Sequence, residues 1–299
     1  AQTAAAQAHV AAAKAAVAPS TPNAKPYQKF QAMFEQFCAE PKLPDTVRPD
    51  SDRFKPQPRA DWYYPPYEIF NNLYFIGTKS AGIYALNTSD GIIMLDTNFD
   101  WDVEELVAGL LQYGLDPANI KYIIITHAHD DRYWGARTLQ DKYPKAHVIM
   151  SEADWNVVAK DTSQPRLKPR KDMVATDGQK LTLGDTTVSI YITPGHTPGT
   201  LSLIFPLKYG YGKETHVGAM WGGTDYNIGR QGVQYWADGK TFFKTYIASV
   251  NRFKMLVDAA GVDTIIPQNM GHTNTLDRIV ELKKNEPDST PQSEALAQR

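Results

Sequence analysis

Two histidines separated by one residue, His127 and His129, stand in the stretch ITHAHDDRYWG, which covers residues 125–135. The run KYIIIT before them is typical of a buried strand, so both histidines follow the carboxyl end of that strand, where ligand sites gather in α/β proteins. An extended H-x-H segment presents both imidazoles on the same side, because side chains two residues apart share a face. The pattern therefore predicts that the two side chains can share one metal ion.

A third histidine, His196, stands in the stretch ITPGHTPG, after a run that predicts a strand over residues 186–193. Its prolines and glycines predict a tight turn that holds the histidine at the end of the strand. Catalytic zinc takes three protein ligands, with imidazole nitrogens at about 2.0–2.1 Å, and keeps one position for water. Three strand-end histidines therefore favour a catalytic zinc site, whereas the isolated histidines are typical of surface or core positions: His9, His147 and His216.

The composition is that of a soluble globular protein. The chain has 299 residues, of which 42% are hydrophobic, and a formal net charge of −2, so nothing indicates a nucleic-acid partner. The basic stretch PRLKPRK at 165–171 is short, broken by prolines and flanked by acids, which is typical of a solvated surface loop rather than a phosphate-binding patch. No apolar run is long enough to span a bilayer.

Cys38 is the single cysteine, which excludes an intrachain disulfide and a cysteine-ligated zinc site. The chain begins with Ala-Gln and lacks an initiator methionine, as a mature chain does after signal-peptide cleavage. We therefore expect a periplasmic or secreted protein, although a shortened chain would look the same.

The chain divides into an N-terminal part, residues 1–66, and a predicted hydrolase domain, residues 67–299. The first part combines an alanine-rich segment with a proline-rich arm over 40–66 that we expect to lie extended over the domain. Helical spacing of apolar residues predicts helices over 103–114, 135–143, 241–260 and 275–284. Short β-branched or aromatic runs predict strands over 72–78, 82–88, 91–97, 121–126, 147–151, 186–193, 200–205 and 263–267. This mixture of strands and helices along the chain indicates a layered architecture, with sheets inside and helices outside.

The sequence resembles the metallo-β-lactamase superfamily, whose motif is T-H-x-H-x-D-H. The resemblance lies in THAHDD, in GHTPG after it, and in GIIMLDT upstream. The stretch PPYEIFNNLYFIGT and the length are most similar to the metallo-β-lactamase subclass with three histidines at the first zinc site. The resemblance runs from about residue 67 to residue 284 and implies an α/β (α+β) fold, a four-layer αββα sandwich with the metal at one edge. It also implies that His127, His129 and His196 bind the first zinc. Asp96 falls where the family has an aspartate under the metal loops, and we expect it to form structural hydrogen bonds there unless it is an ordinary strand-end carboxylate.

The sequence departs from the family pattern at the second metal site, which joins Asp131, the next residue and a late histidine. Arg132 takes the place of a histidine ligand, and a guanidinium has no lone pair to offer a metal. Asn269, in IIPQN, aligns with the late ligand, and His272 is the alternative if the loop is shifted. We therefore expect one Zn²⁺ per chain.

Two neighbouring residues are the catalytic candidates. Asp131 can orient the attacking water or accept its proton, because a three-histidine zinc activates water at neutral pH. Arg132 can partly replace the second cation, either by pairing with Asp131 or by binding a substrate carboxylate, and the alternative is a structural salt bridge with Asp130 or Asp131. The loop 221–236 either borders the site, with Tyr226, Asn227 and Arg230 near the substrate, or is a surface loop held by aromatic packing.

The resemblance implies a hydrolase that opens the amide bond of β-lactam antibiotics, a small-molecule substrate. Lactone or thioester hydrolysis in the same fold uses the same three histidines, so the motifs do not separate these reactions. The altered second site motivates a third hypothesis, a degenerate member that binds a metal or small molecule without turnover. Neither the oligomeric state nor the substrate range follows from the sequence.

Overall fold

The structure, a computed structural model, describes residues 56–209, 214–225, 227–230, 232–270, 275–277 and 279–280, together with residues 4, 7, 8 and 11. Among these residues, no helix has both the length and the apolar character needed to cross a membrane.

The first sheet has seven strands in chain order. Its first four strands pair antiparallel and the remaining ones parallel. Parallel neighbours need long crossover connections, and helices supply them. The strands are β1 (Tyr67–Phe70), β2 (Leu73–Phe75), β3 (Tyr84–Thr88), β4 (Gly91–Leu95), β5 (Ile120–Ile124), β6 (His147–Ser151) and β7 (Met173–Ala175), with helices α4 (Val103–Gln112), α5 (Asp130–Lys142) and α6 (Glu152–Lys160).

The second sheet has five strands in the order β14-β11-β10-β9-β8, antiparallel except for the β11–β14 pair. Helix α7 follows a small two-stranded hairpin and leads back to the edge strand β14. The bounds are β8 (Gln179–Leu183), β9 (Thr186–Ile192), β10 (Leu201–Tyr209), β11 (Glu214–Met220), β12 (Gly229–Arg230), β13 (Val233–Gln234), α7 (Gly239–Ala260) and β14 (Thr264–Ile265).

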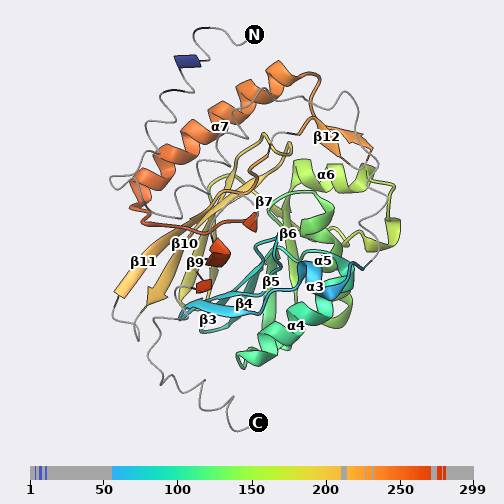
Figure 1. The fold of residues 1–299 in the computed structure, drawn as a ribbon, viewed down its shortest axis with the longest axis vertical. Coiled ribbons are helices and arrows are strands. Elements are labelled where there is room, and N and C mark those ends of the chain that lie inside the picture. The colour runs from blue at the N-terminus through green and yellow to red at the C-terminus, as the bar shows by residue number, and fades with distance from the viewer. Residues whose placement is uncertain are drawn as a thin grey trace.

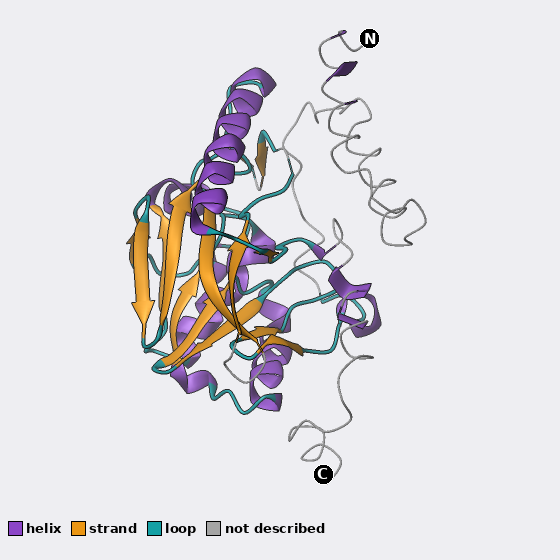
Figure 2. Cartoon of the chain, turned by 90° about the vertical axis from the view of Figure 1, so that its left-hand side faces the viewer, coloured by secondary structure: helices purple, strands orange, loops and turns teal. Residues whose placement is uncertain are grey.

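Side chains along each strand point alternately to the two faces of the sheet, and this alternation produces the layers. Leu95 and Ile124 enter the apolar cluster that joins the two sheets, whereas their neighbours Met94 and Ile123 pack with the cluster under helices α4, α5 and α6. On the other side, Phe253 of α7 packs with residues of β10 and β11. Figure 1 shows α4, α5 and α6 on one side of the strands and α7 on the other, and Figure 2 shows the strands from the side. The predicted αββα sandwich is confirmed.

Several predicted boundaries moved. Helix α5 begins at Asp130 rather than at residue 135, so Asp131 and Arg132 lie in its first turn. Two carboxylates in a first turn suit the positive end of the helix dipole, which explains the earlier start. Helix α6 and strands β1, β7, β8, β12 and β13 were not predicted, and β11 was expected only as a strand before residue 221, without bounds.

The described end of the arm is not fully extended, because α3 (Arg59–Trp62) is a short helix. It contacts the domain through an Arg59–Glu105 ion pair and an edge contact between Trp62 and Trp101 with ring centroids 5.0 Å apart. The division at residue 66 stays a prediction. Three 3₁₀ turns complete the described elements: η1 (Asp100–Asp102), η2 (Pro117–Asn119) and η3 (Pro165–Leu167).

Candidate metal centre

The candidate site lies where loops from the two sheets meet. His127 and His129 occupy the loop between β5 and α5, and His196 occupies the loop between β9 and β10. A backbone hydrogen bond of 2.7 Å from the Leu201 amide to the Thr126 carbonyl joins the two loops directly. The site is therefore assembled from both halves of the sandwich.

The three histidines form a compact, buried triangle. Their ring centroids are 4.4–4.6 Å apart and the rings stand at 70–89° to one another. One ligand atom from each lies within 4.8 Å of the others, which makes them the one group of this kind among the described residues. Tetrahedral zinc with nitrogens at about 2.0–2.1 Å places its ligand atoms about 3.4 Å apart, so a small inward adjustment fits the ion.

Backbone carbonyls fix the proton positions on two rings. The Nδ1–H of His127 donates to the Gly222 carbonyl at 2.7 Å, and that of His196 donates to the Asp225 carbonyl at 2.5 Å. Each Nε2 lone pair is then available to a metal, the usual arrangement of a ligating imidazole. Nε2 of His196 faces Nδ1 of His129 at 3.1 Å, so these two nitrogens point at a shared point. The donor set fits a metal ion.

Burial keeps the three imidazoles neutral. Desolvation lowers the pKa of His196 to about 4 and holds the pKa of His127 and His129 well below 6.5. Neighbouring positive charges lower the pKa of His127 and His129 further. Neutral imidazole is the form that ligates metals, so the rings are ready to bind at neutral pH.

Asp96 anchors the first loop from below. Its carboxylate accepts hydrogen bonds from the Thr126 amide and hydroxyl, both at 2.7 Å, and its φ of +64° places it in the left-handed region. Burial raises its pKa to about 6, against the opposing effects of Arg132 and Thr126. These are the structural hydrogen bonds expected of it.

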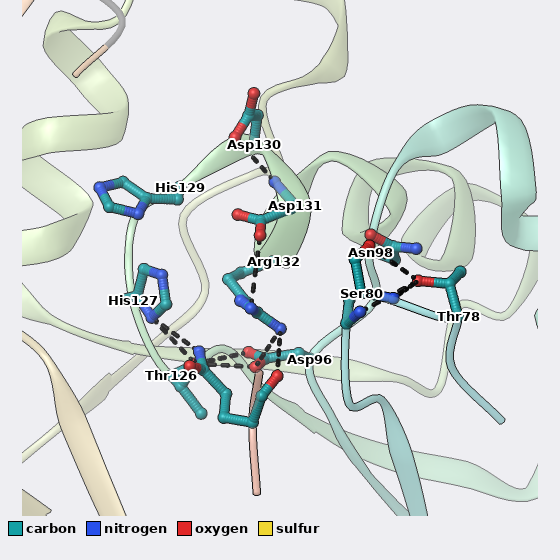
Figure 3. Close-up of polar contacts among 12 residues, drawn as sticks. Thr78, Ser80, Asp96, Asn98, Thr126, His127, His129, Asp130, Asp131 and Arg132 are labelled. Carbon is teal, nitrogen blue, oxygen red and sulfur yellow. Dashed lines mark hydrogen bonds and ion pairs between the residues drawn. The ribbon is translucent and has the colours of Figure 1, made fainter. Parts of the chain in front are cut away.

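Arg132 lies buried between two carboxylates, with a side chain only 2% exposed. Its guanidinium is 3.3 Å from Asp131 and 3.8 Å from Asp96, and it donates to the Gln268 carbonyl at 3.1 Å. Figure 3 shows Arg132 between the two aspartates, beside His127. The geometry favours pairing with Asp131 over direct contact with a substrate carboxylate, and a catalytic role stays a prediction.

The two aspartates after the histidines differ in environment. Asp131 keeps 22% of its side chain exposed, whereas Asp130 is fully buried and pairs with Arg230 at 2.6 Å. The negative charge of Asp131 acts to raise the pKa of both His127 and His196, which places it within electrostatic reach of the centre. Its role as proton acceptor stays a prediction.

The late ligand position holds Asn269, which makes a backbone bridge to Ala81. Its neighbour Gln268 turns inward, and the amide donates to the Thr126 hydroxyl at 2.9 Å. His272 lies outside the described residues. The choice between Asn269 and His272 therefore stays open.

The loop 221–236 borders the site, as one of the two hypotheses expected. The ring of Tyr235 stacks on His129 with centroids 5.9 Å apart and 21° between the planes, and Trp236 donates to the Gly195 carbonyl at 2.8 Å. A Cβ at Gly223 would stand 2.4 Å from Cβ of His196, so only glycine fits there. Of the three candidates in this loop, Arg230 pairs with Asp130 and its charge lowers the pKa of His129, Asn227 is half-buried, and Tyr226 lies outside the described residues.

Sequence reasoning missed Asp154 and Gln268. Asp154 lies buried in the first turn of α6 and accepts hydrogen bonds from both histidine-bearing loops. The spacing of Ser151 and Asp154 is a helix-start pattern, and Ser151 does accept the Asp154 amide hydrogen bond at 3.2 Å. Such a pattern locates the helix, but it does not indicate that the aspartate turns inward.

The chain resembles several known proteins over part of its length. It is 28% identical to the uncharacterized protein YobT of Bacillus subtilis over 146 residues, 46% of this chain and 61% of that protein. It is 32% identical to the N-acyl homoserine lactonase AttM of Agrobacterium fabrum over 106 residues, 31% of this chain and 39% of that protein. The chain thus spans about two fifths to three fifths of these curated relatives.

A solved structure extends the likeness to most of the fold. BJP-1, a subclass B3 metallo-β-lactamase of Bradyrhizobium japonicum, superposes with a TM-score of 0.62 at 22% identity, over 77% of this chain and 85% of that chain. Residues 77–208, which contain all three histidines, match the Metallo-beta-lactamase superfamily. Residues 77–208 of the chain therefore match this superfamily in sequence, and the chain shares the fold of the solved structure.

Proposed function

We propose that the chain is a zinc-dependent hydrolase that opens the amide bond of β-lactam antibiotics with a single zinc ion. The observation that carries the proposal is the buried group of His127, His129 and His196, whose ligand atoms lie within 4.8 Å of one another. The structural neighbour's description as a subclass B3 metallo-β-lactamase supports a β-lactam as the substrate.

The residues around the centre would have separate roles in the reaction. When bound, zinc would supply Lewis acidity and make water nucleophilic at neutral pH. The carbonyls of Gly222 and Asp225 hold two ligand rings in the correct tautomer. We assign to the carboxylate of Asp131 the role of accepting the proton of the attacking water. Arg132 holds that carboxylate at 3.3 Å and contributes a fixed positive charge beside it.

A single zinc follows from the chemistry of the second site. The guanidinium of Arg132, 3.8 Å from Asp96 and 3.3 Å from Asp131, takes the place of a cation between these carboxylates and has no lone pair for a metal. After dialysis against a modest zinc concentration, metal analysis should give one zinc ion per chain. Two zinc ions at full occupancy would contradict the proposal. The variant Arg132→His restores a histidine at the second site. If it still holds one zinc ion per chain, the loop that carries Asn269 also prevents binding of a second ion.

The substrate is tested with zinc-loaded protein and a panel of penicillins, cephalosporins and carbapenems. We expect hydrolysis that chelation abolishes and added zinc restores. The variant His196→Ala should lose both zinc and hydrolysis, whereas the distant variant His147→Ala, which removes an exposed histidine paired with Asp172, should keep both.

Lactone hydrolysis is the second candidate, because the relative AttM is described as an N-acyl homoserine lactonase. The same panel should therefore include an N-acyl homoserine lactone and a thioester. Hydrolysis of either without any β-lactam opening would reject the β-lactam substrate and keep the zinc hydrolase. Tight zinc binding without hydrolysis of any member would instead support a non-catalytic protein.

We also propose the periplasmic or secreted location that the sequence favours. Fractionation of cells that express the natural full-length gene tests it, and recovery of the protein in the cytoplasmic fraction would reject it.

A further inference from the structure

Asp154 connects the two loops that carry the histidines. Its Oδ2 accepts hydrogen bonds from the Ala128 amide at 2.9 Å and from the Thr197 hydroxyl at 2.7 Å, while Oδ1 accepts from the Gly199 amide at 2.8 Å. The side chain is buried in the first turn of α6, a helix that contributes no ligand to the centre. One carboxylate thus contacts both loops at once.

Two of the three contacted residues are direct neighbours of the histidines. Ala128 lies between His127 and His129, and Thr197 follows His196. The first loop follows β5 of the seven-stranded sheet and the second connects β9 with β10 of the five-stranded sheet. Hydrogen bonds to main-chain amides restrain the backbone itself, and the backbone determines where each imidazole begins.

The chemistry of the contacts requires a carboxylate. Two main-chain amides on opposite sides need an acceptor each, and an ionised aspartate offers acceptors on both oxygens. An asparagine of the same shape would turn its NH₂ toward one of these amides and leave that donor without an acceptor. Burying a carboxylate costs several kcal/mol, so its presence here needs a compensating set of donors, which these loops provide.

The second loop approaches the start of α6 so closely at Gly199 that no side chain fits there. A Cβ at Gly199 would stand 1.9 Å from the Ser151 hydroxyl and 2.7 Å from Oδ1 of Asp154. The loop therefore lies directly against the start of α6, and the distance between the loop and Asp154 is fixed by packing as well as by hydrogen bonds.

We propose that Asp154 is a positioning residue of the metal centre: it touches neither metal nor substrate, and it sets the separation of the two ligand-bearing loops through Ala128, Thr197 and Gly199. This inference rests on the proposed metal site. Removing the carboxylate breaks these three hydrogen bonds and loosens the connection between the loops, so the three imidazoles no longer hold the ion at the required distances.

The test compares Asp154→Asn with Glu152→Gln. Glu152→Gln, in the same helix turn, removes an exposed ion pair with Lys171 and leaves the carboxylate of Asp154 in place. We expect Asp154→Asn to weaken zinc binding about 10–100-fold, the usual effect of losing an outer partner of a ligand set. Glu152→Gln should lose less than about 1 kcal/mol of stability and keep the wild-type zinc affinity. Zinc affinity is measured by competition with a chromophoric chelator.

Two further measurements separate positioning from general stability. In the metal-free protein, the amides of Ala128 and Gly199 should exchange hydrogen faster in Asp154→Asn than in Glu152→Gln. The visible spectrum of the cobalt(II)-substituted protein should change in Asp154→Asn alone, because it reports the ligand geometry.

Each outcome decides the inference. Wild-type zinc affinity and an unchanged cobalt spectrum in Asp154→Asn would overturn the role of Asp154 and leave the proposed function standing. Failure of the wild-type protein to bind zinc would reject the proposed function itself. If Asp154→Asn does not fold, Thr197→Val removes one donor to the same carboxylate. That variant should bind zinc several-fold more weakly, and unchanged affinity in it would overturn the inference.

Discussion

The charge of Arg132 is buried away from water, so neighbouring groups of the protein must stabilise it. Its guanidinium is 2% exposed and lies 3.3 Å from Asp131 and 3.8 Å from Asp96. A buried ion pair gains little over an apolar packing, but removal of one partner leaves an uncompensated charge. The same helix carries a contrasting pair, Arg137 with Asp141, whose side chains are 36% and 50% exposed.

The two arginines of α5 provide a matched comparison. Arg132→Gln should destabilise the protein by about 3 kcal/mol, because it leaves two carboxylates near each other in a buried site. Arg137→Gln should cost less than about 1 kcal/mol, because its ion pair is exposed and screened. Urea unfolding measures both, and equal losses would show that the Arg132 ion pairs add nothing beyond an ordinary surface contact.

Asp96 makes the stability of the protein depend on pH. Burial raises its pKa in the folded state from the ordinary 3.8 to about 6. A carboxyl with a raised folded-state pKa stabilises the fold below about pH 4, and this contribution is lost as the pH rises to about 6. Asp96→Asn keeps the left-handed backbone, which asparagine tolerates, and removes the titration.

The free energy of unfolding of wild type minus that of Asp96→Asn should therefore fall between pH 4 and pH 6, by about 3 kcal/mol for two pKa units. Above pH 7 the difference should be constant. Denaturant unfolding at a series of pH values measures it, and a difference that does not change across this range would contradict the raised pKa.

At the level of elements, the loop after β11 holds His196 through close approach. A Cβ at Gly223 would overlap Cβ, Cγ and Cδ2 of His196 at 2.4–2.7 Å, and Tyr246 of α7 donates to the carbonyl of Gly223 or Thr224 at 3.0 Å. The loop cannot retreat without breaking this contact with α7. The imidazole is thus confined between its own turn and this loop.

Gly223→Ala should displace His196 and weaken zinc binding at least tenfold, about 1.4 kcal/mol in binding free energy. The control is Gly178→Ala, which meets no atom within 4 Å but has a φ of +76°. Its strain should cost about 1 kcal/mol of stability without any change in zinc affinity. Equal zinc affinity in the two variants would contradict the steric argument.

The elements differed in how well the sequence predicted them. Helix α7 was predicted nearly to its ends, because its apolar residues recur at helical spacing and Asp238 caps its start. Strands β5 and β6 were predicted from their β-branched and apolar residues, most of which are buried. Among the missed strands, β1, β7, β12 and β13 have two to four residues, and pairing rather than propensity defines a strand of that length.

The candidate site shows the same division. The three histidines follow strand ends, and motif and topology together bring them to one place. Asp154 and Gln268 could not be predicted, because their roles depend on loops that are distant in the sequence. Helix α5 was expected to begin later, and its earlier start explains why Arg132 turns under the loop toward Asp96.

For the whole molecule, the metal would connect the two sheets. His127 and His129 follow a strand of one sheet and His196 follows a strand of the other. A ligand that binds only the folded state stabilises it by mass action, by about 2.7 kcal/mol at a free concentration one hundred times Kd. Zinc should therefore act on the stability of the entire sandwich and not on one loop.

Zinc addition should raise the unfolding temperature of the metal-free protein, and the shift should grow with zinc concentration. His196→Ala, which leaves the ligands of one sheet only, should show a much smaller shift. Differential scanning calorimetry with and without chelator measures both. A shift of the same size in wild type and His196→Ala would contradict binding across the two sheets.

The partners of His127 and His196 are main-chain carbonyls, those of Gly222 and Asp225. Every amino acid carries a main-chain carbonyl, so an exchange of the Asp225 side chain keeps the hydrogen bond to His196 as long as the chain keeps its path. Gly222 differs, because a Cβ there would stand 1.8 Å from the Leu201 carbonyl oxygen. The orientation of the His196 ring is thus robust to mutation at its partner residue, whereas that of His127 depends on a glycine.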